Sequence, residues 1–349
     1  MNIICPLCTY DDLRFLGKRS DLVTAERIHQ EYYKFVEDVS LFDRGIYKCL
    51  VCGFQFVYPQ YNQADLAALY NQDGYGKSQE AWSPLSEFKS SFARDLINEW
   101  KTKYTSLGVV SWREEFQANN KRTPTFLDVG CGRGQDLLVF HELGFEVTGI
   151  DVSDYQIEFA RNHLNFNLVK TSLDDFKPVR KFDCILASHV IEHVVSPHSF
   201  IDDLLRLMNP EGLLLLETPL IFDGGREQDR YRDIYHTLFF DHFSLTVLAL
   251  MHGLQVKNII HVNYKDDLEY HIFILFSLAC RDNPVPNKID RSFLEAFRAC
   301  HEGMHQDFCK WGRYYSAASR WRRAWRLWQQ QGFLPALRRS LHFLKKLNS

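Results

Sequence analysis

The stretch "FLDVGCGRG", residues 126–134, constrains the fold most strongly, because a short apolar strand runs directly into glycines at every second position. Gly130, Gly132 and Gly134 permit a tight turn and a close approach of the backbone to a ligand. The next segment, "QDLLVFHELG", has apolar residues at helical spacing and reaches Gly144, a residue suited to end a helix. We therefore expect a strand, a glycine loop and a helix in this order.

The same rhythm continues along the chain. "FEVTGID" predicts a second strand and "SDYQIEFARNHL" a second helix, and this alternation is typical of a doubly wound parallel sheet. Ligands of such sheets bind over the carboxyl ends of the strands. Asp151 ends the second strand, 151 − 130 = 21 positions after Gly130, where a carboxylate can accept both hydroxyls of a ribose. The pattern predicts a ligand that contains adenosine.

The details of the loop favour one such ligand. A dinucleotide fingerprint has the spacing G-x-G-x-x-G, whereas this loop has G-x-G-x-G with Asp128 two residues before the first glycine. A carboxylate at that place repels a pyrophosphate but suits an ammonium and a sulfonium group. We therefore predict S-adenosylmethionine as the cofactor, with Asp128, Gly130, Gly132 and Gly134 at its methionine end.

These segments together resemble the class I S-adenosylmethionine-dependent methyltransferases over roughly residues 121 to 280. "LDVGCGRG" is similar to their first motif, "GIDVS" to the ribose-binding motif with Asp151 and Val152, and "TSLDDF" to the adenine segment with Ser172 and Leu173. The resemblance implies an α/β fold with a doubly wound, mostly parallel seven-stranded sheet, a Rossmann-like methyltransferase fold. Two further apolar strands, "LQVKNIIHVNY" and "EYHIFILFSLA", are expected to close the sheet edge as an antiparallel hairpin.

Four cysteines indicate a metal site near the N-terminus. "CPLC" and "CLVCGF" each contain a C-x2-C pair, and Cys5, Cys8, Cys49 and Cys52 complete the four-thiolate set that structural zinc prefers. Four protein ligands leave no open position, so this zinc would fold a small zinc-ribbon-like module without activating water. Ordinary buried thiols and a redox pair are the alternatives.

A narrower resemblance concerns the acceptor. "DIYHTLFFDHFSL", residues 233–245, resembles methyltransferases of nucleotide-linked sugars that carry a four-cysteine zinc module and an "IYHEH" sequence. Thr237 and Leu238 replace the last two residues of that motif. In those methyltransferases the Glu and the second His of the motif supply the base chemistry of sugar carbon methylation. Because this chain lacks both, we expect oxygen methylation of a sugar, carried either by a nucleotide or by a glycan or lipopolysaccharide precursor. Carbon methylation of a keto-sugar stays the alternative.

Three histidines are candidate catalytic residues. A hydroxyl acceptor needs a base to take its proton. His189 directly follows the predicted fourth strand, near the transferred methyl group and hence also near the cofactor, while His236 and His242 lie in the acceptor-like segment. The alternative is that these histidines only satisfy buried polar groups. We interpret Glu192 and His193 as mainly structural and place His193 on the following helix.

The last segment differs in charge from the rest of the chain. Formal net charge is −3, yet residues 310–349 contain ten Lys and Arg and no Asp or Glu. Trp321, Trp325 and Trp328 share one face of a predicted basic helix, which fits either packing within the protein or contact with an anionic membrane. With no run of about 18 apolar residues and no leader-like N-terminus, we expect a cytoplasmic protein, peripheral at the inner membrane face if the tail binds lipid.

The chain is accordingly divided into four parts: a zinc module (1–60), a helical linker or cap (61–120), the cofactor-binding methyltransferase domain (121–283) and a helical basic tail (284–349). The expected partner is a small-molecule or glycan acceptor, an oligomer is compatible with the sequence, and nucleic acid is disfavoured because no RNA-binding motif accompanies the basic tail. A regulatory protein that binds the cofactor without turnover is the competing function from another class.

Overall fold

The computed structural model describes residues 3–22, 44–62, 91–220, 231, 236–263, 270–278, 290–295 and 298. The chain divides into two compact units, Met1–Lys288 and Ile289–Ser349. Within the second unit, residues 291–295 are helical. The tryptophans of the predicted basic tail lie outside the described residues.

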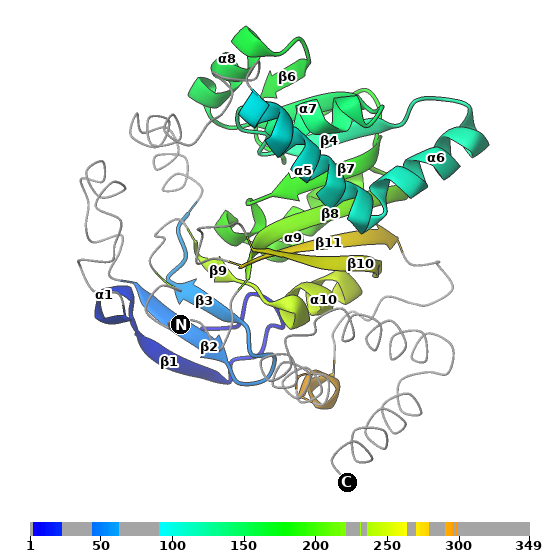
Figure 1. The fold of residues 1–349 in the computed structure, drawn as a ribbon. Helices are drawn as coiled ribbons and strands as arrows, with labels where there is room; N and C mark the ends of the chain where they lie inside the picture. The colour runs from blue at the N-terminus through cyan, green and yellow to red at the C-terminus, as the bar shows by residue number, and fades with distance from the viewer. Residues whose placement is uncertain are drawn as a thin grey trace. The chain divides into compact units, whose positions relative to one another are not determined.

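A seven-stranded sheet forms the centre of the first unit, with the strand order β10-β11-β8-β7-β4-β5-β6 (Figure 1). The five strands from β8 to β6 run parallel, and the hairpin of β10 and β11 joins β8 in the antiparallel direction. The predicted mostly parallel, seven-stranded methyltransferase sheet and its closing hairpin are confirmed. The bounds are Thr125–Val129 (β4), Glu146–Asp151 (β5), Asn167–Lys170 (β6), Phe182–Ser188 (β7), Met208–Leu220 (β8), Leu254–Asn263 (β10) and Tyr270–Leu278 (β11).

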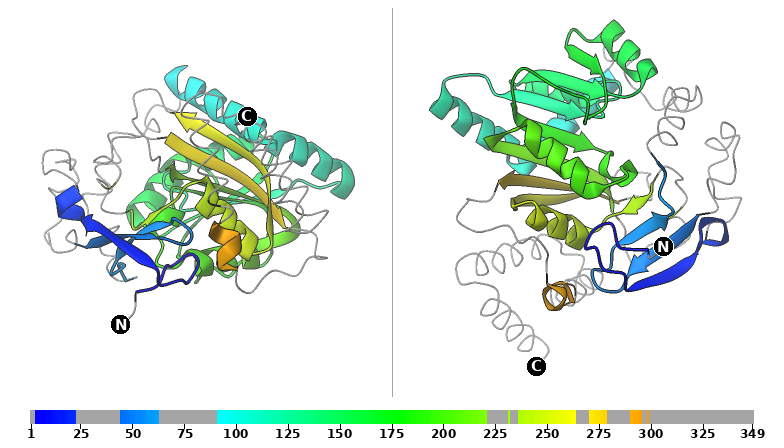
Figure 2. Two further views of the ribbon diagram at one scale, coloured as in Figure 1. Left: turned by 90° about the horizontal axis from the view of Figure 1, so that it is seen from below. Right: turned by 180° about the vertical axis from the view of Figure 1, so that it is seen from behind.

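Helices cover both faces of this sheet, as the predicted doubly wound arrangement requires. α5 and α7 lie on one face and α9 on the other (Figures 1 and 2). The bounds are Ser91–Leu107 (α5), Val109–Asn120 (α6), Gln135–Glu142 (α7), Asp154–His163 (α8), Pro197–Leu207 (α9) and His242–Met251 (α10). α6 continues to Asn120 before Lys121 takes a left-handed conformation.

The main hydrophobic core lies between the sheet and α5, α7 and α8. Phe126 of β4 and Phe140 of α7 stack with ring centroids 3.7 Å apart, and Tyr104 of α5 packs against Phe140 at 4.7 Å. Parallel strands buried on both faces are expected to be apolar throughout, and every residue of β4 is buried. The core therefore packs α5 against α7, which in turn packs on β4.

The second sheet contains the N-terminal strands and has the order β1-β2-β3-β9. Its strands are Leu13–Lys18 (β1), Gly45–Cys49 (β2), Gln55–Tyr58 (β3) and Leu238–Phe239 (β9), with the short helix α1 at Arg19–Leu22. β9 follows β8 by many residues in the chain, yet it pairs with β3 through Gln55 and Phe56. A segment from the acceptor region thus completes the sheet of the cysteine module. In the part of the chain that the structure describes, no helix has the length and apolar character needed to span a bilayer.

Candidate cofactor and metal sites

The strand register brings the predicted cofactor residues to one edge of the sheet. Val129 pairs with Ile150 of β5 and with Ala187 of β7, and Ser188 pairs with Glu217 of β8. The chain order reverses between β4 and β7, which is the switch point where ligands of such sheets bind. The loops that follow these strands therefore meet where a cofactor is expected.

The three glycines of the loop answer different requirements, although all have a positive φ: 71° at Gly130, 50° at Gly132 and 84° at Gly134. An added Cβ at Gly130 would lie 2.7 Å from Val190 Cγ2, and one at Gly134 would lie 2.6 Å from Leu164 Cδ1. At Gly132 it would meet no atom of the described residues within 4 Å. Gly130 and Gly134 therefore serve packing, whereas Gly132 faces open space that a ligand can fill.

Asp151 closes the loop from the end of β5. Its Oδ2 accepts a hydrogen bond from the Gly132 amide at 2.9 Å, and its Oδ1 accepts one from the Ser153 amide at 2.8 Å. Burial raises the pKa of Asp151 above its ordinary value, although these two amides oppose the shift. A carboxylate oxygen accepts more than one hydrogen bond, so both oxygens can still accept from a ribose. Val152, the next residue, is 42% exposed.

Asp128 lies beneath the loop and is 2% exposed. Burial raises its pKa far above the usual range, and the nearby carboxylates of Asp136, Asp151 and Glu217 raise it further. Burying several acidic groups together is unfavourable unless positive charge compensates them. The site is therefore electrostatically suited to a cationic ligand, and the place of Asp128 at the methionine end of a cofactor stays a prediction.

The predicted adenine segment follows β6. The Thr171 amide donates to the Asp151 carbonyl at 3.0 Å, which places Ser172 directly beside the end of β5. Ser172 Oγ lies 2.8 Å from Asp175 Oδ2 and so holds the turn, while the Leu173 carbonyl accepts from Arg206. The turn at Ser172 and Leu173 is therefore braced on both sides.

Two further residues come from α5 and were not predicted as part of the site. The hydroxyl of Tyr104, fully buried, donates to Asp136 Oδ1. Lys103 Nζ lies 3.8 Å from Glu217 Oε2 and 4.5 Å from the centre of the Tyr104 ring. Tyr104 lies four residues after Trp100 on α5. Aromatic residues at this helical spacing indicate packing, so the sequence gives no signal that the Tyr104 hydroxyl belongs to the site.

His189 follows β7 with a φ of 54°, and its amide donates to the Glu217 carbonyl at 3.0 Å. Its Nδ1 lies 3.3 Å from Glu192 Oε1 and its Nε2 lies 3.5 Å from Glu217 Oε1. A neutral imidazole carries only one N–H, so facing carboxylates on both sides favours the doubly protonated ring. The pKa of His189 is accordingly raised well above its ordinary value, because the two carboxylates outweigh the opposing effect of desolvation.

Glu192 and His193 belong to a single 3-10 turn, Ile191–His193, and not to the following helix, where we predicted His193. α9 begins only at Pro197, after Ser196 caps it. The turn brings Glu192 and His193 close to His236, and the rings of the two histidines lie 4.9 Å apart. The structure thus joins one predicted catalytic residue, His236, with the pair that was interpreted as structural.

The remaining acceptor residues are described only in part. His242 begins α10, and its side chain lies outside the described residues, as do Ile234 and Tyr235. Asp241 and Ser244 form a capping box at the start of α10.

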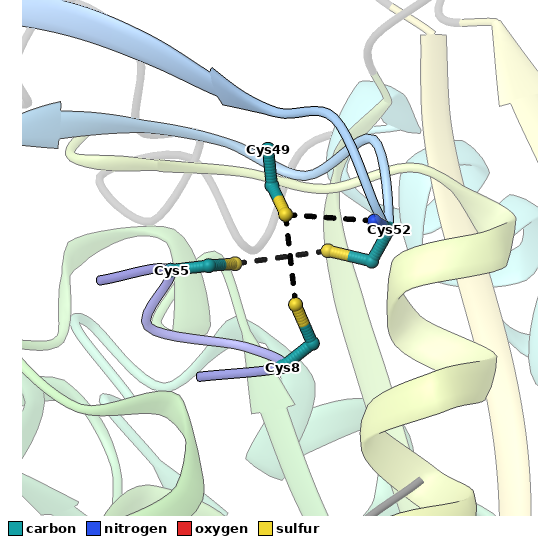
Figure 3. A group of neighbouring side chains, drawn as sticks. All are labelled: Cys5, Cys8, Cys49 and Cys52. Carbon is teal, nitrogen blue, oxygen red and sulfur yellow. Dashed lines mark hydrogen bonds between the residues drawn. The ribbon is translucent and has the colours of Figure 1, made fainter. Parts of the chain in front are cut away.

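The four predicted metal ligands converge (Figure 3). Cys5 Sγ lies 3.6 Å from Cys52 Sγ, and Cys8 Sγ lies 3.6 Å from Cys49 Sγ. Tetrahedral zinc with Zn–S bonds of about 2.3 Å requires sulfur atoms about 3.8 Å apart, so this arrangement fits the ion. All four side chains are buried, and the six cysteines that the structure describes are free of disulfide bonds.

The cysteine module is attached to the rest of the first unit close to these ligands. His198 of α9 has Nε2 2.7 Å from the carbonyl of Leu7, which lies between the first two cysteines. Its Nδ1 lies 2.8 Å from His252 Nε2. His198, one of the histidines of the central region, therefore contacts the module and not the edge of the sheet where the glycine loop lies.

Comparison with known proteins identifies the central region. Residues 97–258 match a family model described as a methyltransferase domain. The chain contains a methyltransferase domain. The match begins inside α5 and covers Lys103 and Tyr104.

Curated relatives of the methyltransferase domain are named ubiquinone biosynthesis O-methyltransferase. The one from Rhodopseudomonas palustris (strain HaA2) is 36% identical over 97 residues, which cover 26% of this chain and 38% of that protein. The one from Glaesserella parasuis serovar 5 is 32% identical over 152 residues, which cover 39% of this chain and 58% of that protein. The chain thus spans less than two thirds of the length of these relatives.

Solved structures similar to the methyltransferase domain include a magnesium protoporphyrin IX methyltransferase from Synechocystis PCC 6803 with bound SAM. It has a TM-score of 0.44 and 14% identity, and the match covers 63% of this chain and 100% of that one. A plantazolicin methyltransferase in complex with SAH has a TM-score of 0.38 and 18% identity, covering 58% and 97%.

Proposed function

We propose that this chain is an S-adenosylmethionine-dependent O-methyltransferase. The observation that carries the proposal is the glycine loop of the methyltransferase domain, where Gly132 faces open space and donates its amide to Asp151. Asp151 would hold the ribose hydroxyls, Val152 would lie beside them, and the turn at Ser172 and Leu173 would flank the adenine.

The methionine end of the cofactor would occupy the acidic region of the site. The buried carboxyl group of Asp128 and the partly buried one of Asp136 complement a ligand that carries an ammonium and a sulfonium. Lys103 is the cation that α5 contributes to the same region, 3.8 Å from Glu217. The cofactor supplies an electrophilic methyl group, so the protein has to position the acceptor and help to remove its proton.

The acceptor is proposed to be a hydroxyl group. The names of the relatives specify O-methylation, which agrees with the choice of oxygen over carbon methylation made from Thr237 and Leu238. A sugar hydroxyl is the class that the sequence predicts, and a hydroxyl group on a precursor of ubiquinone is what the relatives' names suggest. Proton removal would involve His236 and His242, of which His236 lies beside the ionised carboxylate of Glu192. His189, whose ring the two facing carboxylates favour in the protonated form, would have to lose its proton before it could act as a base.

The four cysteines are proposed to bind structural zinc and to hold the module against the methyltransferase domain. β9, which leads from His236 toward α10, pairs with β3 of this module. Zinc would in this way support the acceptor side of the protein without touching the acceptor. Membrane contact through the basic tail is a separate proposal, and flotation of the full chain with anionic vesicles tests it.

The cofactor part is tested by isothermal titration with S-adenosylhomocysteine. We expect binding to the unmodified chain and its loss in Asp151→Ala. Asp154→Ala is the matched control, because Asp154 is an exposed carboxylate three residues later whose ion pair with Lys170 lies at the surface. Equal affinity of the unmodified chain and Asp151→Ala would refute the assignment.

The acceptor part is tested with the same protein and methyl-labelled S-adenosylmethionine. Nucleotide-sugars and catechols are offered separately, and the labelled product is analysed for an O-methyl or a C-methyl group. Cofactor binding without transfer to either class would favour the non-catalytic regulatory protein. A C-methyl product would contradict the proposed reaction.

A further inference from the structure

Asp128 differs from the other acidic side chains at the edge of the sheet where the glycine loop lies. It is 2% exposed, and no group of the described residues donates a hydrogen bond to its carboxyl. A buried carboxylate without donors or a compensating charge is costly, because water no longer solvates it. In the ligand-free protein the neutral, protonated carboxyl is therefore the favoured form of Asp128.

The neighbouring acidic groups, by contrast, have donors within the protein. Each accepts at least one hydrogen bond, and such bonds stabilise the ionised form of a carboxyl. The donors are the Tyr104 hydroxyl for Asp136, the Gly132 and Ser153 amides for Asp151, and the Ser188 hydroxyl for Glu217. Asp128 is thus the acidic group of this edge whose charge the protein supports least.

Acidic groups face Asp128 from three elements. Burial is the largest cause that raises the pKa of Asp128, and Asp136 of α7, Asp151 of β5 and Glu217 of β8 raise it further. Each of these groups, when ionised, repels a second negative charge nearby. Ionisation of Asp128 is therefore opposed both by burial and by its neighbours.

The other titratable groups of the region do not neutralise Asp128. Tyr104 of α5 and Cys131 of the glycine loop face it, and burial, together with the surrounding carboxylates, raises the pKa of both. They are neutral near pH 7. The cations Lys103 and His189 act on the carboxyl of α7, whose pKa they lower against the effect of burial. A positive charge for Asp128 itself is best supplied by a ligand.

We propose that Asp128 is protonated in the ligand-free protein and gives up this proton when the cofactor binds. This inference rests on the proposed function. The ammonium group of the methionine part donates a hydrogen bond to Asp128 and supplies the compensating charge. The O–H bond of the carboxyl breaks, its electron pair stays on the carboxylate oxygen, and the proton passes to the solvent.

Cofactor affinity then depends on pH through Asp128. Because the ligand binds the ionised form, the affinity for S-adenosylhomocysteine, which carries the same ammonium group, should rise with pH by up to about tenfold per pH unit. The rise should end where the pH exceeds the pKa of Asp128 in the ligand-free protein. At about pH 5.5 the ligand's own amino group stays charged, since α-amino groups titrate near 8.

Isothermal titration of the full, zinc-loaded chain at about pH 5.5 measures the proton directly. The titration is repeated in two buffers of different ionisation enthalpy, and the difference in apparent binding enthalpy gives the number of protons released. We expect about one proton per S-adenosylhomocysteine. 5′-Methylthioadenosine lacks the ammonium and the carboxylate of the cofactor and should bind without releasing a proton.

Two variants assign the proton to its residue. Asp128→Asn keeps the size of the side chain and removes its ionisation, so it should release no proton and bind S-adenosylhomocysteine about 10- to 100-fold more weakly. Asp154→Asn is the matched control, because Asp154 is an exposed carboxylate paired with Lys170 at the surface, and it should release the proton as the unmodified chain does. If Asp128→Asn does not fold, the comparison of the two ligands on the unmodified chain decides.

The proposal is overturned if S-adenosylhomocysteine binds without releasing a proton, if 5′-methylthioadenosine releases as much, or if Asp128→Asn still releases it. Each of these results leaves the proposed function standing, because the cofactor has bound. Absence of binding by the unmodified chain removes the proposed function and the proton release with it.

Discussion

Gly132→Ala separates cofactor binding from folding. The new Cβ would meet no atom of the described residues within 4 Å, so it creates no clash in the protein itself. The backbone cost comes from the φ of 50°, since alanine in the left-handed region loses about 1 kcal/mol relative to glycine. We therefore expect the free energy of unfolding to fall by about 1 kcal/mol.

The effect on the cofactor should be larger. The Cβ would extend into the space beside the amide that donates to Asp151, where we place the methionine end of the ligand. We expect the affinity for S-adenosylhomocysteine to drop by more than about tenfold, which corresponds to about 1.4 kcal/mol. Isothermal titration measures the affinity, and urea unfolding measures the stability of the same protein.

Gly108→Ala is the matched control. Gly108 has a φ of 96°, and an added Cβ there would also meet no described atom within 4 Å, but it lies between α5 and α6 and away from the glycine loop. We expect a comparable loss of stability with unchanged cofactor affinity. If Gly132→Ala binds S-adenosylhomocysteine as tightly as the unmodified chain, the open space at Gly132 does not hold the cofactor and the reasoning fails.

Three other changes test the fold and the site. Cys49→Ser should remove the zinc measured by elemental analysis and lower the thermal midpoint, and an unchanged midpoint after zinc loss would contradict a structural ion. Asp183→Asn should cost about 2–3 kcal/mol at pH 7 in urea unfolding, since Asp183 is buried and paired with the half-exposed Arg122. Burial opposes the shift, yet hydrogen bonds from Arg122, Thr125 and Asn209 lower the pKa of Asp183. The stability that these bonds contribute is therefore present above the unfolded pKa near 4. This contribution is lost as the pH falls through the pKa of Asp183 in the folded protein. Asp183→Asn should therefore lack this dependence of stability on pH. Tyr104→Phe should lower stability by about 1–2 kcal/mol and weaken S-adenosylhomocysteine binding, because Asp136 loses a buried donor; equal affinity would exclude α5 from the site.

Local patterns predicted the elements that depend on neighbouring residues. The alternation of apolar segments and helical periods predicted the parallel sheet, which the strand order confirms. The spacing of Cys5, Cys8, Cys49 and Cys52 predicted four converging thiols, which the structure shows at 3.6 Å in each pair. These features follow from sequence because short spacings determine backbone turns and ligand geometry directly.

The roles of individual glycines were only partly accessible. The sequence predicted close approach to a ligand for all three, whereas Gly130 and Gly134 face Val190 and Leu164 in the protein itself. Which neighbour an added Cβ would meet depends on the packing of segments far apart in the chain. The spacing of the glycines contains no information on the distance from a Cβ to those segments.

The sequence by itself determined the doubly wound sheet, the glycine loop with Asp151 at the next strand end, and the two C-x2-C pairs, since each depends on short local motifs. Only the tertiary structure decided that α5 brings Tyr104 to Asp136 and that β9 brings His236 to Glu192 and His193. These contacts join segments far apart in the chain. They arise from core packing and strand pairing, which produce no periodic pattern in the local sequence.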